Sequence, residues 1–81
     1  MKIDKISEMN PEALLADGFE DAIIGMCIQF GQSPVVTYDY EKCIEILKER
    51  DKMDNEEAIE YMEYNVIGAY MGVHSPVFLI K

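Results

Sequence analysis

Hydrophobic residues recur three and four positions apart in three stretches of this chain, a spacing that gathers them on one side of an α-helix. The first stretch covers residues 19–30, the second residues 40–50 and the third residues 55–71. Each pattern predicts a helix with one buried face. Gly25 interrupts the first helix, which indicates that another element packs closely over that position.

Capping residues mark where several of these helices begin. Asp39 can cap the second helix, and Asp54 with Glu57 three residues later has the spacing of a capping box before the third. Asn10 followed by Pro11 predicts a further short helix near the start of the chain. Asp17 with Glu20 three residues later has the same spacing before the first stretch. Capping and periodicity therefore agree for all three helices.

Two short segments have the composition of β-strands. Residues 35–38 read Val-Val-Thr-Tyr after a proline, and residues 77–80 are all apolar. Because two helices joined by a short turn run antiparallel, we expect the chain to return to the end of the first strand, so that the two strands pair antiparallel. The run 77–80 predicts burial on both faces, and a third strand would come from residues 2–6 or from a second subunit.

Together these elements predict a small, helix-rich α+β fold that forms a single domain over residues 1–81. Three main helices would pack on a short antiparallel two-stranded sheet. Dimerisation would extend this sheet, because its strand edges are otherwise unpaired. The helix faces place the following residues in one core: Ile23, Met26, Ile44, Leu47, Ile59, Met62 and Val66.

Composition agrees with a folded chain and limits its partners. Hydrophobic residues make up 49% and charged residues 28% of 81 residues, which suits one globular domain. Sixteen acidic against seven basic residues give a net charge of −9, which disfavours direct binding to nucleic acid or to anionic membranes. No apolar run approaches the roughly 18–20 residues of a membrane-spanning helix, and the first residues lack the apolar segment of a signal peptide. We therefore expect a cytoplasmic protein.

Groups that carry catalysis or bind metals are scarce. His74 is the single histidine, and Ser75 beside it in sequence does not make a nucleophile pair. Cys27 and Cys43 are too few for a zinc site and lie in apolar stretches, which predicts reduced thiols in the core. The sequence therefore predicts a protein that is not an enzyme, without catalytic residues, metal or cofactor, in which His74 is an ordinary loop residue.

Acidic residues cluster on the third predicted helix, with two tyrosines among them. On an exposed face, carboxylates about 5–6 Å apart beside amphipathic rings would suit a basic protein surface. The candidate partner-binding residues are Glu56, Glu57, Glu60, Glu63, Tyr61 and Tyr64. The alternative is a solvated helix face whose tyrosines are half-buried against the core.

Several segments resemble a group of small accessory proteins of tailed bacteriophages and prophages, a group without an agreed activity. The resemblance covers about residues 14–80. The segments that carry it are Asp17-Gly18-Phe19, Val36-Thr37-Tyr38-Asp39, Glu57-Ala58-Ile59-Glu60, Asn65-Val66-Ile67-Gly68-Ala69-Tyr70-Met71-Gly72 and Ser75-Pro76. The resemblance implies an accessory role, in which such a protein binds, blocks or sequesters a host component.

Three functions follow as hypotheses. The net charge and the acidic helix favour a non-enzymatic accessory protein that binds and blocks a host defence protein through its acidic surface. A second hypothesis is a homo-oligomeric sponge for a small nucleotide signal, with Lys42, Lys48 and Arg50 as candidate ligand-binding residues. The third is a purely structural or assembly role.

Overall fold

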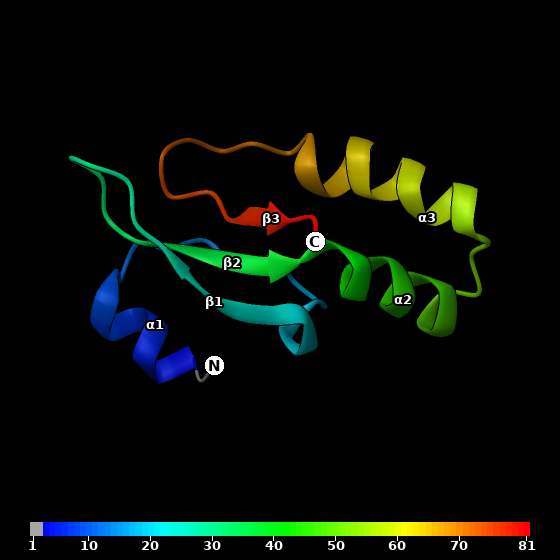
Figure 1. Cartoon of the computed structure of the whole chain (residues 1–81), viewed down its shortest axis with the longest axis horizontal. Helices are drawn as coiled ribbons and strands as arrows, with labels where there is room; N and C mark the ends of the chain where they lie inside the picture. The colour runs from blue at the N-terminus through cyan, green and yellow to red at the C-terminus, as the bar shows by residue number, and fades with distance from the viewer. Residues whose placement is uncertain (1–2) are drawn as a thin grey trace.

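The computed structural model describes residues 3–81 and contains helices at both ends of a small mixed sheet (Figure 1). Its elements are helix α1 (Ile3–Met9), the 3-10 turn η1 (Glu20–Ala22), strands β1 (Ile23–Cys27) and β2 (Val35–Asp39), helices α2 (Tyr40–Arg50) and α3 (Asn55–Tyr61), the π-helical segment η2 (Met62–Ile67) and strand β3 (Val77–Leu79). The predicted α+β class is therefore confirmed.

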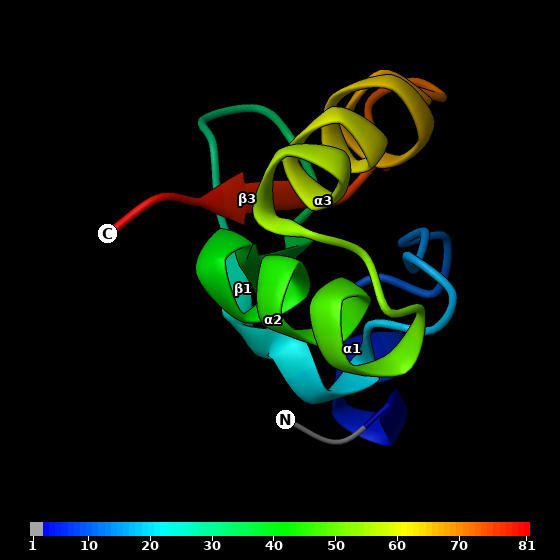
Figure 2. The ribbon, with the colours of Figure 1, turned by 90° about the vertical axis from the view of Figure 1, so that its right-hand side faces the viewer.

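The sheet has the order β1-β2-β3, so the predicted two-stranded sheet is wrong. Strand β1 pairs antiparallel with β2, whereas β3 pairs parallel with it. The predicted antiparallel pairing of residues 35–38 with residues 77–80 is therefore wrong. Residues 68–76 carry the chain past the whole length of β2 before β3 begins, so β3 runs in the same direction as β2 (Figure 1). Helices α1 and α3 lie on the same side of this sheet (Figure 2).

The prediction of a helix over residues 19–30 is wrong, because strand β1 lies in this segment. Only the short turn η1 is helical there, and Ile23–Cys27 is extended. The β-branched pair Ile23-Ile24 and the following Gly25 disfavour a helix, and the central strand β2 gains a hydrogen-bonded neighbour on its second edge. The predicted close packing over Gly25 is also wrong, because a side chain there would meet no atom within 4 Å.

The N-terminal helix also differs from the prediction. Residues 3–9 form α1, so a strand over residues 3–6 is ruled out, while Lys2 lies outside the described residues. The backbone N–H of Asn10 donates to the Ile6 carbonyl at 2.9 Å, so Asn10 ends a helix where we expected it to begin one. Its buried side chain donates to the Pro34 carbonyl at 2.8 Å, which fixes the N-terminal segment to the β1–β2 hairpin.

The predicted caps of α2 and α3 are confirmed. The Asp39 carboxylate accepts the Lys42 N–H at 3.2 Å, and Asp54 with Glu57 forms the complete capping box. Lys81 also reaches the Asp39 carboxylate at 2.9 Å, and this hydrogen bond lowers the pKa of Asp39. The start of α3 is thus defined by its own sequence.

The third helix ends earlier than residue 71. It widens into the π-helical η2, where the Gly68 N–H donates to the Glu63 carbonyl at 2.9 Å. A methyl group at position 68 would lie only 2.6 Å from that oxygen, so the wide last turn requires glycine. The chain then leaves the helix toward β3.

The core lies between the sheet and the three helices. Its buried apolar residues are Ile6, Phe19, Ala22, Ile23, Val36, Tyr38, Cys43, Ile44, Leu47, Ala58 and Met62. Of the predicted core, Ile23, Ile44, Leu47 and Met62 are confirmed as buried, and Met26 and Val66 pack against it while partly exposed. The prediction that Ile59 belongs to the core is wrong, because its side chain is 36% exposed.

Two further burial predictions are wrong. Cys43 is a buried core thiol as expected, but Cys27 is exposed at the end of β1. In the C-terminal run, Phe78 is half-buried, whereas Val77, Leu79 and Ile80 are exposed. Alternate residues of a strand point to opposite faces, and the described chain covers only the face to which Phe78 belongs.

Replacing Leu47 or Met62 by alanine should lower the free energy of unfolding by about 2–5 kcal/mol, because each fully buried side chain leaves a cavity. Ile59→Ala is the matched control and should lose clearly less, since its side chain is partly in water. Chemical denaturation followed by circular dichroism measures these losses. An equal loss in Ile59→Ala and Leu47→Ala would contradict this core.

Candidate functional site

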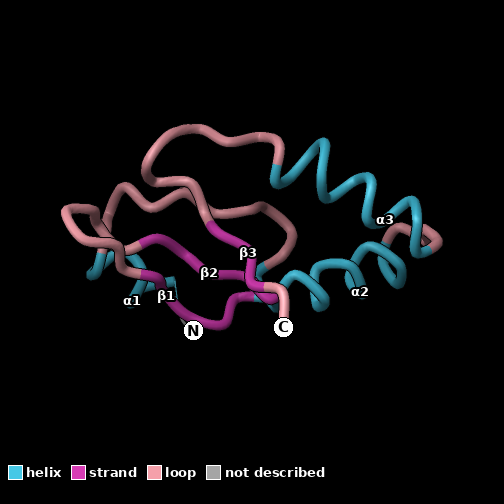
Figure 3. The backbone as a smooth tube through the Cα atoms, turned by 45° about the horizontal axis from the view of Figure 1, so that its top comes forward, coloured by secondary structure: helices cyan, strands magenta, loops and turns pink. Residues whose placement is uncertain are grey.

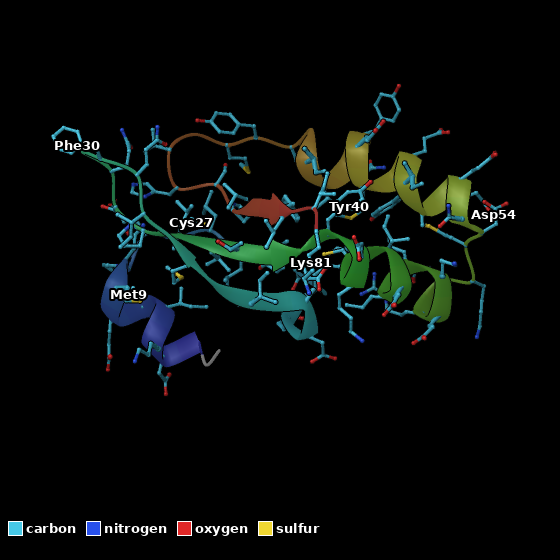
Figure 4. The ribbon with its side chains drawn as sticks, in the orientation of Figure 1. Met9, Cys27, Phe30, Tyr40, Asp54 and Lys81 are labelled. Atoms are coloured by element: carbon cyan, nitrogen blue, oxygen red, sulfur yellow. The ribbon has the colours of Figure 1, made fainter. Side chains whose placement is uncertain are left out.

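Helix α3 and η2 present the predicted acidic residues to solvent. Glu56, Glu60 and Glu63 are exposed, and they follow one another at the four- and three-residue spacing of one helix face. Within residues 3–81 none of these three carboxylates forms an ion pair. Figure 4 places Asp54, where this helix begins, at the far end of the molecule from Phe30.

Glu57 differs from the other three candidate glutamates. Its carboxylate accepts the Asp54 N–H at 3.1 Å, while its own N–H donates to Asp54 at 2.9 Å. The side chain is exposed but already has a role in the capping box. Of the four candidate glutamates, Glu56, Glu60 and Glu63 are therefore the ones outside the capping box.

The two candidate tyrosines differ in exposure. Tyr64 is 73% exposed, whereas Tyr61 is 37% exposed and lies closer to the body of the protein. Together with Glu57, Glu60, Met53 and Asn65 they line a shallow hollow of about 380 Å³. An exposed ring beside carboxylates is the arrangement expected of a binding face, and Tyr64 rather than Tyr61 provides it.

The three candidate cations of a nucleotide site do not converge. Lys42 lies in the first turn of α2 and pairs with Glu45 at 3.8 Å, while Arg50 lies at the last residue of the helix. Lys48 is exposed between them. The eight residue steps from Lys42 to Arg50 extend over about 12 Å of helix, too far for one phosphate.

Arg50 is engaged in the fold. Its guanidinium donates to the Gly18 carbonyl at 2.8 Å and to the Asp51 carboxylate at 3.0 Å, and it lies 5.4 Å above the centre of the Phe19 ring. The hydrogen bond from Arg50 lowers the pKa of Asp51. These contacts hold the segment before η1 against the end of α2.

An apolar groove opens between the β1–β2 hairpin and the segment from η2 to β3. It was not predicted from the sequence. Its volume is about 720 Å³. Its lining residues are Cys27, Ile28, Gln29, Gln32, Ser33, Val35, Val66, Ile67, Ala69, Tyr70, Gly72, Val73, Ser75, Pro76, Val77 and Phe78. In the described chain this lining contains no Asp, Glu, Lys or Arg.

One signal in the sequence could have found this groove. Residues 22–38 and residues 64–80 contain no Asp, Glu, Lys or Arg, although such residues make up 28% of the chain. The two loops that flank the groove lie at the end of the molecule away from the α2–α3 connection (Figure 3).

His74 lies in the loop 68–76, as predicted, and links it to the N-terminal segment. Its Nδ1 accepts from the Asn10 amide nitrogen at 3.1 Å, and its Nε2 lies 2.9 Å from the Glu12 carboxylate. The Asn10 amide orientation follows from its donation to Pro34 and its acceptance of the Glu12 N–H. Both ring nitrogens are therefore occupied by structural contacts.

Residues 3–81 offer neither a metal-binding cluster nor a membrane-spanning helix. No three or more His, Cys, Asp and Glu side chains there are grouped so that they could hold a metal ion. No helix in that range combines the length and apolar character that crossing a membrane requires.

Comparisons with protein-family models, with curated proteins and with solved structures find no match for this chain. The described surface has two features suited to binding, the acidic face (Glu56, Glu60, Glu63 and Tyr64) and the uncharged groove. The resemblance to phage accessory proteins stays a prediction.

The two cysteines should differ sharply in reactivity. Burial, followed by the nearby Asp39 carboxylate, raises the pKa of Cys43 to about 12, while Cys27 is exposed in the groove. The folded protein should therefore react with a thiol reagent such as DTNB at Cys27 alone, and at both cysteines in denaturant. A Cys27→Ser variant is the control. Rapid reaction of that folded variant would contradict the burial of Cys43.

Proposed function

We propose that this protein is a non-enzymatic binding protein that occupies a basic surface of a partner protein through its acidic face. The observation that carries this proposal is the group Glu56, Glu60 and Glu63, which are exposed and unpaired within residues 3–81, beside the exposed ring of Tyr64. Unpaired carboxylates at neighbouring helix positions attract a basic partner without first breaking internal ion pairs.

Charge and ring have separate parts in this proposal. A net charge of −9 and the acidic face accelerate the encounter with a positively charged partner. Exposed charges are screened by salt and add little to the final affinity. Tyr64 would therefore supply the desolvated contact that slows dissociation.

The resemblance to phage accessory proteins supports a host protein, such as a defence component, as the partner. Binding would then block that protein in the cytoplasm of the host cell. The nucleotide sponge receives less support, because Arg50 and Lys42 already have partners and the three cations are dispersed along α2. A structural or assembly role would use the same surfaces without blocking an activity.

We also propose that the protein associates with itself. Strands β1 and β3 are the two edges of the sheet. Ile24 on β1 and Val77, Leu79 and Ile80 at β3 leave apolar surface in water. An exposed strand edge is a template for pairing with another chain, and a contiguous exposed apolar patch marks an interaction surface.

Reversing Glu56, Glu60 and Glu63 to lysine should slow association with a basic partner by about tenfold or more at low salt. The same change should flatten the salt dependence of the association rate. The partner is first isolated on the immobilised wild-type protein from host lysate, and its association rate is then measured by surface plasmon resonance at several salt concentrations.

A matched control replaces Glu41, Glu45 and Glu49 by lysine. These residues are exposed on α2, and their replacement changes the net charge by the same amount. It should retain most of the wild-type rate if the position of the charges matters. An equal loss in both triple variants would mean that net charge alone acts. A wild-type rate in the α3 variant at low salt would contradict the proposal.

Tyr64→Ala should mainly accelerate dissociation of the same complex, because it removes apolar contact area and leaves the charge unchanged. Tyr61→Ala is the comparison, since that ring is only 37% exposed. Dissociation rates measured on the captured partner distinguish the two. A larger effect of Tyr61→Ala than of Tyr64→Ala would place the contact in the hollow instead of at the exposed ring.

A further inference from the structure

The tip of the β1–β2 hairpin carries a fully exposed aromatic side chain. Phe30 is 101% exposed and projects from the end of the hairpin (Figure 4). Single exposed aliphatic residues are common on protein surfaces, but a phenylalanine with its whole ring in water is unusual. Neighbouring Ile28 is also largely exposed, so the tip is an apolar projection.

The backbone of the turn places Phe30 outward. The Gln32 N–H donates to the Gln29 carbonyl at 2.9 Å, which makes a four-residue turn with Phe30 and Gly31 at its centre. Gly31 has a φ of +76°, the value that the third residue of a type II turn needs. This hydrogen-bonded turn holds Phe30 at the corner, ready for contact without further ordering of the loop.

The projection and the uncharged groove occur on the same hairpin. Cys27, Ile28 and Val35 line the groove, and Phe30 lies in the loop between them. The opposite wall comes from Tyr70 and Val73 in the loop 68–76. Because Phe30 is fully exposed, it does not fill the groove of its own chain.

We propose that Phe30 of one copy inserts into the groove of a second copy, and that the second copy inserts its Phe30 in return. A projection and a hollow side by side on one surface are self-complementary about a two-fold axis, the arrangement of an isologous dimer. This inference rests on the self-association proposed above, but it places the interface at the hairpin tip and the groove and not at the strand edges. It is independent of the acidic face.

Electrostatics favour a second copy at this surface. Each chain carries a net charge of −9, so two copies repel wherever their acidic surfaces meet. Residues 22–38 and 64–80, which form the tip and the groove, contain no Asp, Glu, Lys or Arg. Two copies that meet there avoid most close like-charge contacts, although the Glu12 carboxylate lies 2.9 Å from His74 in the loop 68–76. A basic partner is expected to choose the acidic face.

The groove suits an aromatic ring. Its volume of about 720 Å³ lies in the range of protein sites that enclose ligands larger than one phenyl ring. Its walls combine aliphatic side chains with the aromatic Tyr70 and Phe78, and rings pair favourably with both. Room therefore remains for Ile28 of the second copy beside Phe30.

Phe30→Ser should shift the full-length protein from dimer to monomer in sedimentation equilibrium. A central aromatic anchor accounts for about tenfold or more in affinity, and the symmetric dimer loses two of them, so the dissociation constant should rise by about a hundredfold. The variant should keep its fold, because the side chain contacts nothing essential. Val73→Asp, which places a charge in the groove, should have the same effect.

Ile80→Ser is the matched control. Ile80 is 71% exposed, follows strand β3 and is not among the groove-lining residues. It should leave the dimer intact if the interface is the tip and groove. Loss of the dimer in Ile80→Ser, with Phe30→Ser still dimeric, would overturn this inference and favour association through the strand edge.

A cross-link tests the insertion directly. Phe30→Cys also removes the ring, so the variant is oxidised with diamide at a protein concentration above its raised dissociation constant. The new thiol should then join Cys27 of the second copy, since two thiols give two protons and two electrons to the oxidant. The buried Cys43 should not react. Covalent dimers on a non-reducing gel, identified by peptide mass spectrometry and lost when Cys27→Ser is added, support the proposal.

The remaining outcomes are also decisive. A wild-type protein that stays monomeric at high concentration overturns both the self-association and this interface. A dimer that survives both Phe30→Ser and Val73→Asp overturns the interface alone. Neither result bears on the acidic face, whose test measures binding of a basic partner and uses different residues.

Discussion

The fold depends above all on the burial of Tyr38 in the middle of the central strand. Its ring is fully buried, stacks on Phe78 of β3 with centres 5.4 Å apart, and stands opposite Ile23 of β1. Its hydroxyl accepts the Ala16 N–H at 2.7 Å, and burial raises the pKa of Tyr38. One side chain thus connects both edge strands to the segment that leads into η1, and its buried hydroxyl is hydrogen-bonded.

Charge is distributed so that the protein offers two kinds of surface. The start of α3 presents carboxylates to water, whereas the hairpin tip at Phe30, at the opposite end of the molecule (Figure 4), and the loop 68–76 contain no Asp, Glu, Lys or Arg. The basic partner and the second copy that we propose would therefore use different surfaces. Both could be engaged at the same time, which would make a dimer with two acidic faces.

The irregular segments of the chain are held by specific polar contacts. Asn10 ties the N-terminal segment to Pro34 and His74, and Arg50 ties Gly18 to the end of α2. These contacts use the histidine and one of the candidate ligand-binding cations as structural residues. In so small a domain, where a core buries limited apolar surface, such anchors help to order long connections.

By itself, the sequence determined the elements whose signals are local. The starts of α2 and α3 are set by their capping residues, Asp39 for α2 and Asp54 with Glu57 for α3. The β-branched run after Pro34 predicts β2. Capping and backbone preference both act within a few residues. The exposed acidic face followed from the same helix periodicity.

Only the tertiary structure decided β1, the parallel pairing of β3 and the uncharged groove. A helix over 19–30 and a strand at Ile23–Cys27 satisfy the same apolar pattern, and pairing with β2 selected the strand. The path of residues 68–76 set the direction of β3, and it brought two uncharged segments, far apart in sequence, to the two sides of one groove. No local sequence signal predicts that these two segments lie side by side, because their position depends on contacts between distant parts of the chain.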